Sequence, residues 1–532
     1  MQHLHFDLKF PVDFCLLMRD NITYLQQKNV RQIIRQFDKA TVKPLIFFCL
    51  LAHPVFAQNS PKREFRGVWI ATVANIDFPS QHGLKRKQQK AEFRKLLDFH
   101  RGNGFNAVVV QVRPAADAFY ANSREPWSYW LTGTQGQPPR PFYDPLAYMV
   151  RECRKRNLEF HAWFNPYRAV FDTAKTLAAN HITKTQPAWF LKYGNQRLFN
   201  PGLPAVRDYV TQVILDVVRH YDIDAVHFDD YFYPYTLAND TLRDDITFAQ
   251  YPNGFGNKDD WRRHNVSLLV KKLHDSLRAV KPWVKFGISP FGVWRNRSAD
   301  STGSDTQAGQ TTYDNLYADV RLWLREGWID YVVPQIYFST RHPKVNYAKL
   351  LDWWTRNSYG RHLYVGQGPY KIARDRDSTW FLPGQTGEQI RLNRTYAQVH
   401  GSVFFSSRSL VANPLGVTDT LRDAYYRSAA LIPTLETMPG NAPKPPARMR
   451  VRYRGEKTVL RWKSGDANVR YFAVYRLGQK NEKNEKTELL ATVPATRNGR
   501  KPRKRHKYTH ASACTGCRYA VTALDRTHRE SR

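Results

Sequence analysis

Short β-rich runs alternate with amphipathic helical stretches from Glu64 onward, and the number of these repeats constrains the fold more than any other feature. A strand followed by a helix, repeated along a chain, is typical of a parallel sheet with crossover helices. Eight strands are predicted, at 65–72, 106–112, 158–165, 223–229, 284–289, 330–337, 362–367 and 402–406. Eight β/α units between residues 62 and 435 predict an α/β fold of the (β/α)8 barrel type.

The predicted helices lie between these strands. They cover 85–102, 145–156, 204–221, 259–280, 313–326, 347–357 and 387–399, with an eighth after residue 417. In a barrel of this type the carboxyl ends of the strands and the loops that follow them form the active site. Functional residues are therefore expected directly after the strands.

A Pro-rich segment at 436–446 follows the barrel and is predicted to be a linker, because it suits neither a helix nor a central strand. Short predicted strands then occur at 448–453, 458–463, 471–477, 488–493 and 518–525. Trp462 and Tyr519 occupy positions typical of a sandwich core. The region 447–532 resembles a fibronectin type III module, which implies a small all-β, immunoglobulin-like sandwich.

The N-terminal extension, residues 1–57, contains a segment that begins with the basic Lys43, continues with a short apolar run and ends at the small residue Ala57. This order is typical of a signal peptide, although about forty mostly polar residues precede it. An uncleaved anchor or a buried segment is the alternative. We therefore expect an exported protein, in the periplasm or at the outer envelope surface.

The formal net charge is +35, from 81 Lys and Arg against 46 Asp and Glu. Residues 444–532 carry 24 basic and 7 acidic side chains, so nearly half of the excess lies in the last sixth of the chain. Such an excess favours polyanionic neighbours. In an exported protein the basic C-terminal module, with its cluster at 500–507, is expected to touch anionic wall polymer or a membrane surface, and no nucleic acid. A plain solvated loop is the alternative.

No cofactor and no metal are predicted. His506, His510, Cys514 and Cys517 are zinc-ligand types, but only three residues separate the two pairs, and the second runs straight into a predicted strand. The sequence also has no Walker motif and no GxSxG element, which argues against nucleotide and serine-hydrolase chemistry.

The end of the fourth predicted strand carries the most informative polar residues. Side chains alternate along a strand, so Asp229 is expected to face the barrel interior, together with Asp224, His227 and Tyr231. Asp230 shares this site only if the chain has left the strand by then; otherwise it caps or salt-bridges the loop. Glycoside hydrolysis needs two carboxyl groups, one as acid and one as base or nucleophile.

Further polar and aromatic residues near the strand ends are candidates for binding a substrate. They are suited to hydrogen-bonding sugar hydroxyls, orienting the acids or stacking on a sugar ring, and a buried structural hydrogen bond is the alternative for each. The candidates are Arg113, Asp117, Trp163, Asn165, Arg168, His227, Tyr231, Ser289, Trp294, Arg295, Gln335 and Tyr337.

Several segments carry a specific resemblance to a known family. They are RGVWIATVANID at 66–77, EPWSYWLTG at 125–133, DPL at 144–146, HAWFNPYR at 161–168, NPG at 200–202, HFDDY at 227–231 and SPFGVWR at 289–295. In this order they resemble the glycosyl-hydrolase-like family 10 barrels. The resemblance implies a bacterial envelope glycosidase, and some members of the family resemble, in activity, hydrolases of peptidoglycan strands stripped of their stem peptides.

The fourth strand also resembles the family 18 chitinase signature but departs from it. His227 replaces one acid, and Tyr231 stands where the proton-donating Glu of that family belongs. The chitinase mechanism is therefore not carried over. With Asp229 as base or nucleophile, the acid is expected to be Asp230, then Glu125, then Asp117.

The sequence thus predicts a glycoside hydrolase of the cell envelope that cleaves peptidoglycan glycan strands by carboxylate acid–base catalysis. Two alternatives remain. One is a hydrolase of another polysaccharide, and the other is a non-catalytic glycan-binding barrel.

Overall fold

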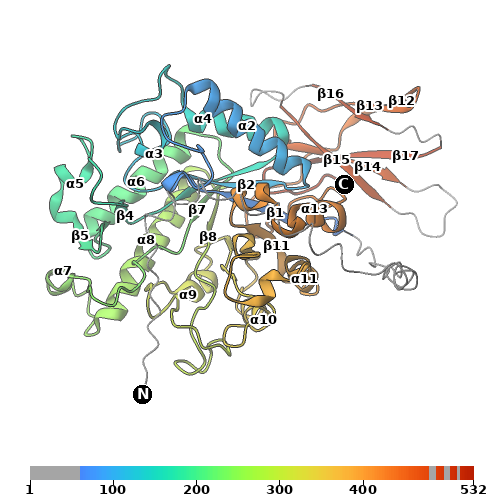
Figure 1. Ribbon diagram of the computed structural model, residues 1–532. Helices are drawn as coiled ribbons and strands as arrows, with labels where there is room; N and C mark the ends of the chain where they lie inside the picture. Colours follow the sequence, from blue (N-terminus) through green and yellow to red (C-terminus); the bar gives the residue numbers. More distant parts are fainter. Residues whose placement is uncertain (1–59, 478–486, 497–503, 512–515) are drawn as a thin grey trace, which may run out of the picture. The chain divides into compact units, whose positions relative to one another are not determined.

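Eight parallel strands close into a barrel in the computed structural model, which describes residues 60–477, 487–496, 504–511 and 516–532. The strands are β1 (Phe65–Ile70), β2 (Ala107–Arg113), β3 (Glu159–Phe164), β7 (Ala225–Phe228), β8 (Lys285–Ile288), β9 (Tyr331–Val332), β10 (His362–Gln367) and β11 (Val399–Phe404). They pair in the order β1-β11-β10-β9-β8-β7-β3-β2, and Figure 1 shows the helices around them. The predicted (β/α)8 barrel is confirmed.

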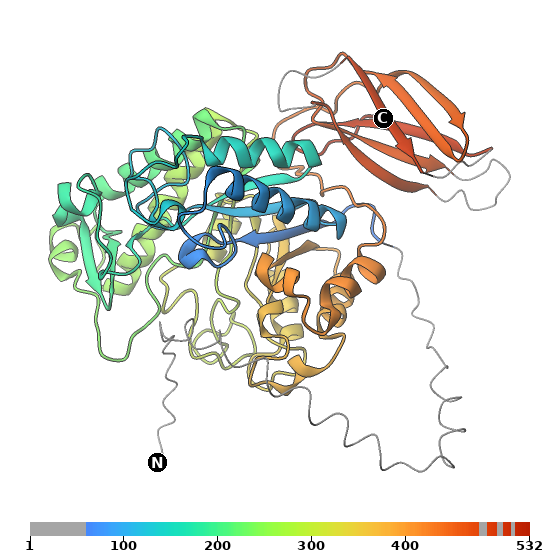
Figure 2. The same cartoon turned by 45° about the horizontal axis from the view of Figure 1, so that its top comes forward.

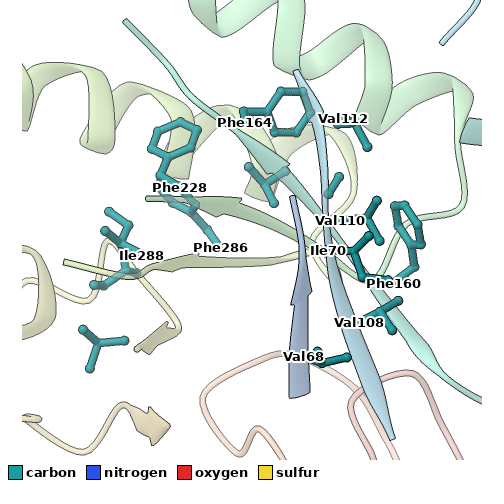
Figure 3. Close-up of a cluster of buried hydrophobic side chains, with 14 of the residues drawn as sticks. Val68, Ile70, Val108, Val110, Val112, Phe160, Phe164, Phe228, Phe286 and Ile288 are labelled. Atoms are coloured by element: carbon teal, nitrogen blue, oxygen red, sulfur yellow. The ribbon is translucent and has the colours of Figure 1, made fainter. Parts of the chain in front are cut away.

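The alternation of side chains along each strand separates two layers of core. Outward-facing residues such as Val68, Val110 and Phe228 pack between the strands and the surrounding helices (Figure 3). Inward-facing residues such as Trp69, Trp163 and Tyr331 form a second cluster inside the barrel. The inward direction predicted for His227 in β7 is therefore confirmed, because its ring is hydrogen-bonded to Tyr331 of this inner cluster.

The barrel helices are α2 (Arg86–Gly102), α4 (Pro145–Arg156), α6 (Pro204–His220), α8 (Lys258–Val280), α9 (Val320–Arg325), α10 (Tyr347–Arg356), α11 (Gln385–Asn393) and α13 (Val417–Thr420). Figure 2 shows several of them from a second direction. Helix α9 begins later than predicted. Tyr317 has a left-handed backbone, and Asp319 caps the helix by accepting a hydrogen bond from the Leu322 backbone N–H.

Strand β9 is shorter than predicted, because Pro334 has no N–H to donate to a neighbouring strand. A small sheet of β4 (Arg168–Val170), β5 (Phe190–Tyr193) and β6 (Gln196–Phe199), in the order β4-β6-β5, was not predicted. It lies in the loop region after β3 and carries Arg168 near the carboxyl end of that strand. The long loops are thus partly folded.

The C-terminal region contains two three-stranded antiparallel sheets. One pairs β12 (Ala447–Arg454), β13 (Lys457–Lys463) and β16 (Arg505–His510); the other pairs β15 (Glu488–Pro494), β14 (Tyr471–Leu477) and β17 (Arg518–Leu524). Trp462 and Tyr519 belong to the core between them, as predicted. Strand β16 was not predicted, because its first residues belong to the basic cluster at 500–507, which also suited a solvated loop.

Residues 60–532 form one compact unit, and the domain limits at 435 and 447 stay a prediction. The predicted signal peptide and part of the basic cluster at 500–507 lie outside the described residues. In the portion of the chain that is described, no helix is long and apolar enough to cross a membrane.

Candidate active site

Asp229 and Asp230 lie together where β7 ends at the carboxyl edge of the barrel. The side-chain amide of Asn165 donates to both carboxylate oxygens of Asp229, at 3.3 and 3.2 Å. The chain has left the strand at this point, since the backbone N–H of Phe232 donates to the Asp230 carbonyl at 3.0 Å. The Asp230 carboxylate accepts hydrogen bonds from the Gln335 amide, at 3.1 Å, and from the Tyr235 hydroxyl.

The two carboxyl groups differ in electrostatic environment. Burial raises the pKa of Asp229 to about 7 and the nearby Asp230 carboxylate adds to this, whereas Arg168, Trp163 and Asn165 oppose it. Burial also raises the pKa of Asp230, against the hydrogen bonds from Tyr235 and Gln335. Two neighbouring carboxyl groups in unlike surroundings are the arrangement that separates an acid from a base.

Arg168 is the cation beside this acidic pair. Its backbone N–H donates to the side-chain oxygen of Asn165 at 2.9 Å, which orients the amide of Asn165 toward Asp229. Its guanidinium carbon lies 4.5 Å from the ring centroid of Tyr231. Arg168, Asn165 and Tyr231, predicted separately from two strands, are therefore brought together at the pair.

Aromatic side chains that follow several barrel strands lie near one another, and two of them, Tyr337 and Tyr370, interact electrostatically with Asp230. The ring centroid of Tyr337, which was predicted to bind the substrate, lies 6.3 Å from that of Phe405 and 5.7 Å from that of Tyr370. Tyr370 is 40% exposed. The indole N–H of Trp163 is buried and lies close enough to the Asp229 carboxylate to lower its pKa. These rings and this N–H are suited to contact with a sugar.

Tyr235, Tyr370 and Phe405 were missed by sequence reasoning. Tyr370 follows β10 and Phe405 follows β11. Tyr235 and Phe405 belong to runs of apolar or aromatic residues, and Tyr370 lies between Pro369 and Lys371, so no polar alternation distinguishes any of them. Their only signal was the rule that residues after barrel strands face the site.

His227 and Ser289 lie beneath the pair, inside the barrel. The His227 ring is hydrogen-bonded to the Ser289 hydroxyl at 3.0 Å and to the Tyr331 hydroxyl at 3.1 Å, and it accepts from the Trp69 indole at 3.3 Å. Burial holds the pKa of His227 well below its usual value. His227 therefore supports the site as a neutral group.

Asp224 does not share the interior with His227, contrary to expectation. Asp224 is two and four residues from Val226 and Phe228, so its side chain points to the same side of the strand as theirs, toward the helices. Its carboxylate lies at the amino end of the strands, 3.5 Å from Arg154 and 3.1 Å from Arg470.

Glu125 forms a buried ion pair with Arg113. Two hydrogen bonds of 2.6 Å join the guanidinium to the two carboxylate oxygens, and both side chains are almost fully buried. Arg113 also donates to the Asn165 backbone carbonyl. Asp117 is buried nearby, where burial raises its pKa to about 6 and the Gln135 amide donates to it at 3.3 Å.

Glu125→Gln is expected to lower the free energy of unfolding by about 2–3 kcal/mol, because a charged hydrogen-bonded pair loses one charge in a buried site. We expect kcat to stay within about tenfold of wild type, since Glu125 is engaged by Arg113. Urea unfolding and steady-state kinetics test this. A kcat loss of about a thousandfold with unchanged stability would instead identify Glu125 as the acid.

Trp294 and Arg295 lie in another cluster. The Trp294 ring stacks on Trp353 at 5.6 Å between centroids. Arg295 pairs with Asp300 at 3.1 Å and with Asp314 at 2.8 Å. In the described structure neither residue is hydrogen-bonded or ion-paired to the acidic pair, so their role in substrate binding stays a prediction.

Comparisons with known proteins identify the family of this chain. The family described as glycosyl hydrolase-like 10 matches residues 64–382. Glycosyl hydrolase YngK of Bacillus subtilis is 45% identical over 500 residues, which are 91% of this chain and 95% of the relative. Glycosyl hydrolase DigH of Escherichia coli K12 is 36% identical over 66% of this chain and 84% of the relative.

Among solved structures, α-L-fucosidase isoenzyme 2 from Paenibacillus thiaminolyticus aligns with a TM-score of 0.41 and 12% identity, over 67% of this chain and 49% of that one. A likeness this low carries no argument about function. The match to the family and the identity to its curated relatives are sufficient without it: the chain belongs to the glycosyl hydrolase-like 10 family and is a glycoside hydrolase.

Proposed function

We propose that this enzyme hydrolyses the glycan strands of peptidoglycan and prefers strands from which the stem peptides have been removed. The main observation in support of catalysis is the pair of carboxyl groups of Asp229 and Asp230, with aromatic rings near it. Removing the stem peptide frees the lactyl carboxylate of each N-acetylmuramic acid, so a stripped strand is a polyanion. A chain with a net charge of +35 is suited to such a substrate.

Within this proposal Asp229 is the proton donor to the leaving oxygen. Its pKa of about 7 keeps the carboxyl largely protonated in mildly acidic solution. Asp230 accepts hydrogen bonds from Tyr235 and Gln335, which favour its ionised form, and it acts as base or nucleophile. These roles reverse the order expected from the sequence, because burial favours the protonated form of Asp229, whereas the hydrogen bonds from Tyr235 and Gln335 favour the ionised form of Asp230.

The pH dependence of kcat/KM tests the role of Asp229. We expect kcat/KM to fall about tenfold per pH unit above pH 7, because deprotonation of Asp229 removes the acid. Initial rates between pH 5 and 9 on one soluble glycan are measured at roughly constant ionic strength. A flat profile up to pH 9 would show that Asp229 is not the acid.

The substrate is tested with purified peptidoglycan, intact and amidase-stripped, with products identified by mass spectrometry. We expect wild type to release short glycans from stripped strands faster than from intact ones, and Asp230→Asn to release none. Chitin, a neutral polymer of N-acetylglucosamine, and a neutral α-glucan serve as controls. Cleavage of a control glycan with no cleavage of peptidoglycan would overturn the proposed substrate.

We also propose that the protein acts outside the cytoplasm, where this substrate lies. The apolar run before Ala57 supports export. Fractionation of cells that produce the full chain, with the N-terminus of the mature protein determined, tests this. Recovery of full-length protein in the cytoplasm alone would contradict it.

A further inference from the structure

One face of the sheet β12-β13-β16 consists almost entirely of basic residues. The register pairs Arg450 with Arg461 and Arg461 with Lys507, so these three side chains form a row across the strands. A second row pairs Lys463 with Arg505. Eight of the eleven strand positions on this face are basic, namely Arg450, Arg452, Arg454, Lys457, Arg461, Lys463, Arg505 and Lys507. We call these eight residues the basic sheet face.

The opposite side of the same sheet is apolar. Leu460 and Trp462 alternate with Arg461 and Lys463 and belong to the core of the C-terminal module. The alternation therefore directs the basic side chains away from the core. Seven of the eight are exposed, and Lys463 is half-buried.

In the part of the chain that the structure describes, no acidic side chain forms an ion pair with this face. The three remaining positions of the face are Ala447, Val459 and Thr509. The pKa of Lys463 is lowered by the charges of Arg448, Arg505 and Arg450 around it. Like charges directly opposite each other on neighbouring strands destabilise a sheet. The module thus retains a charge pattern that folding alone disfavours.

We propose that the basic sheet face binds a linear, phosphate-rich polyanion, at a site separate from the acidic pair of the barrel. Same-face residues repeat about every 6.8 Å along a strand, so the cations form closely spaced rows that suit a polymer with one charge in each short repeat unit. Five of the eight are arginines, whose planar guanidinium groups bind phosphate through two hydrogen bonds.

A polymer fits this face better than a lipid bilayer does. Membrane-binding surfaces combine basic residues with apolar side chains that insert among the lipids. Tyr453 is the one exposed large apolar residue in the described part of the module, and the strand alternation places it on the other side of the sheet. A charged face with no exposed large apolar side chain to insert is suited to electrostatic binding of a chain.

The test measures binding of fluorescein-labelled inorganic polyphosphate to the full chain by fluorescence anisotropy, between about 50 and 200 mM salt. The variant carries Arg450→Ser, Arg461→Thr and Lys507→Thr. A control carries Lys87→Ser, Arg94→Ser and Lys95→Ser on α2, which are exposed and remove the same charge. We expect the first variant to bind roughly tenfold or more weakly, with a salt slope smaller by about 3, and the control to bind like wild type.

Binding of two further ligands is measured to identify the chemical group that the face recognises. Polygalacturonate presents carboxylates in place of phosphates, and phosphatidylglycerol vesicles present phosphate on a membrane. If both triple variants bind polyphosphate equally weakly, binding depends only on net charge and the proposal is wrong. Tighter binding to vesicles or to polygalacturonate than to polyphosphate would also contradict it. Thermal unfolding serves as a folding control, and we expect no loss of stability because like-charge pairs are removed. Binding requires no turnover, so failure here is distinct from failure of the proposed glycosidase.

Discussion

Asp229→Asn is expected to lower kcat on a glycan about 10²–10⁴-fold, because the variant lacks the proton donor. It is also expected to be more stable than wild type at pH 8. The pKa of Asp229 is raised from 3.8 to about 7 in the folded protein, so the folded state holds a proton between these pH values that the unfolded chain has lost. Stability is therefore lost as pH rises through this window, by about 1.4 kcal/mol per pKa unit and on the order of 4 kcal/mol in all.

Asparagine does not titrate, so the stability advantage of Asp229→Asn should disappear near pH 4. Urea unfolding at pH 4 and pH 8 measures the difference. Asp275→Asn on α8, exposed and paired with Lys271, is the matched control and should change neither kcat nor the pH dependence of stability. An advantage equal at both pH values would contradict the raised pKa.

The leaving group distinguishes the two carboxyl roles. An aryl glycoside with a dinitrophenolate leaving group needs no proton from the enzyme, so Asp229→Asn should retain most activity on it. Asp230→Asn should lose activity on aryl and natural glycosides alike, since it lacks the base or nucleophile. The opposite pattern would restore the order of roles expected from the sequence.

Lys285→Met is expected to destabilise the protein by about 3–5 kcal/mol, because it leaves a buried carboxylate without its main counter-ion. Lys285 begins β8, and its ammonium lies 2.6 and 2.7 Å from the two carboxylate oxygens of Glu159. Glu159 also contacts the rings of His161, at 2.9 Å, and His528, at 2.7 Å. This cluster lies at the amino ends of the strands, opposite Asp229.

The double variant Lys285→Met with Glu159→Gln should recover most of the lost stability, since no buried charge then lacks a partner. The charges of Lys285 and His528 hold the pKa of Glu159 well below its ordinary value, against the effect of burial. The Glu159 contribution is therefore present above pH 4.5 and lost as pH falls through the lowered pKa. Additive single effects in urea unfolding would show that the two charges do not interact.

Much of the barrel follows from local sequence. The alternation along β7 directs His227 and Asp229 inward, and the 3.6-residue periodicity predicts α4 at the bounds found in the structure. These patterns depend on residues two to four positions apart. The exceptions also have local causes, such as the missing N–H of Pro334, which ends β9, and the cap at Asp319, which delays α9.

The candidate site was only partly predictable. The sequence left open whether the chain turns after β7 so that Asp230 can join Asp229. The hydrogen bond from the Phe232 backbone N–H to the Asp230 carbonyl shows that it does. The engagement of Glu125 by Arg113 was not foreseen, because both residues had separate functional interpretations. Tyr370 and Phe405 come to the site only through the ordering of β10 and β11 in the closed barrel.

The sequence by itself determined the number and order of the β/α units, the inward direction of Asp229 and the basic character of the C-terminal module. Only the tertiary structure decided which distant groups meet. Glu159 and His528 are 369 residues apart, and their contact depends on how the C-terminal sheets pack against the barrel. The pKa of Asp229 likewise depends on burial by residues from several strands. Periodicity predicts which side of each helix or strand faces the core. Burial and charge pairing arise only when closure of the barrel brings separate segments into contact.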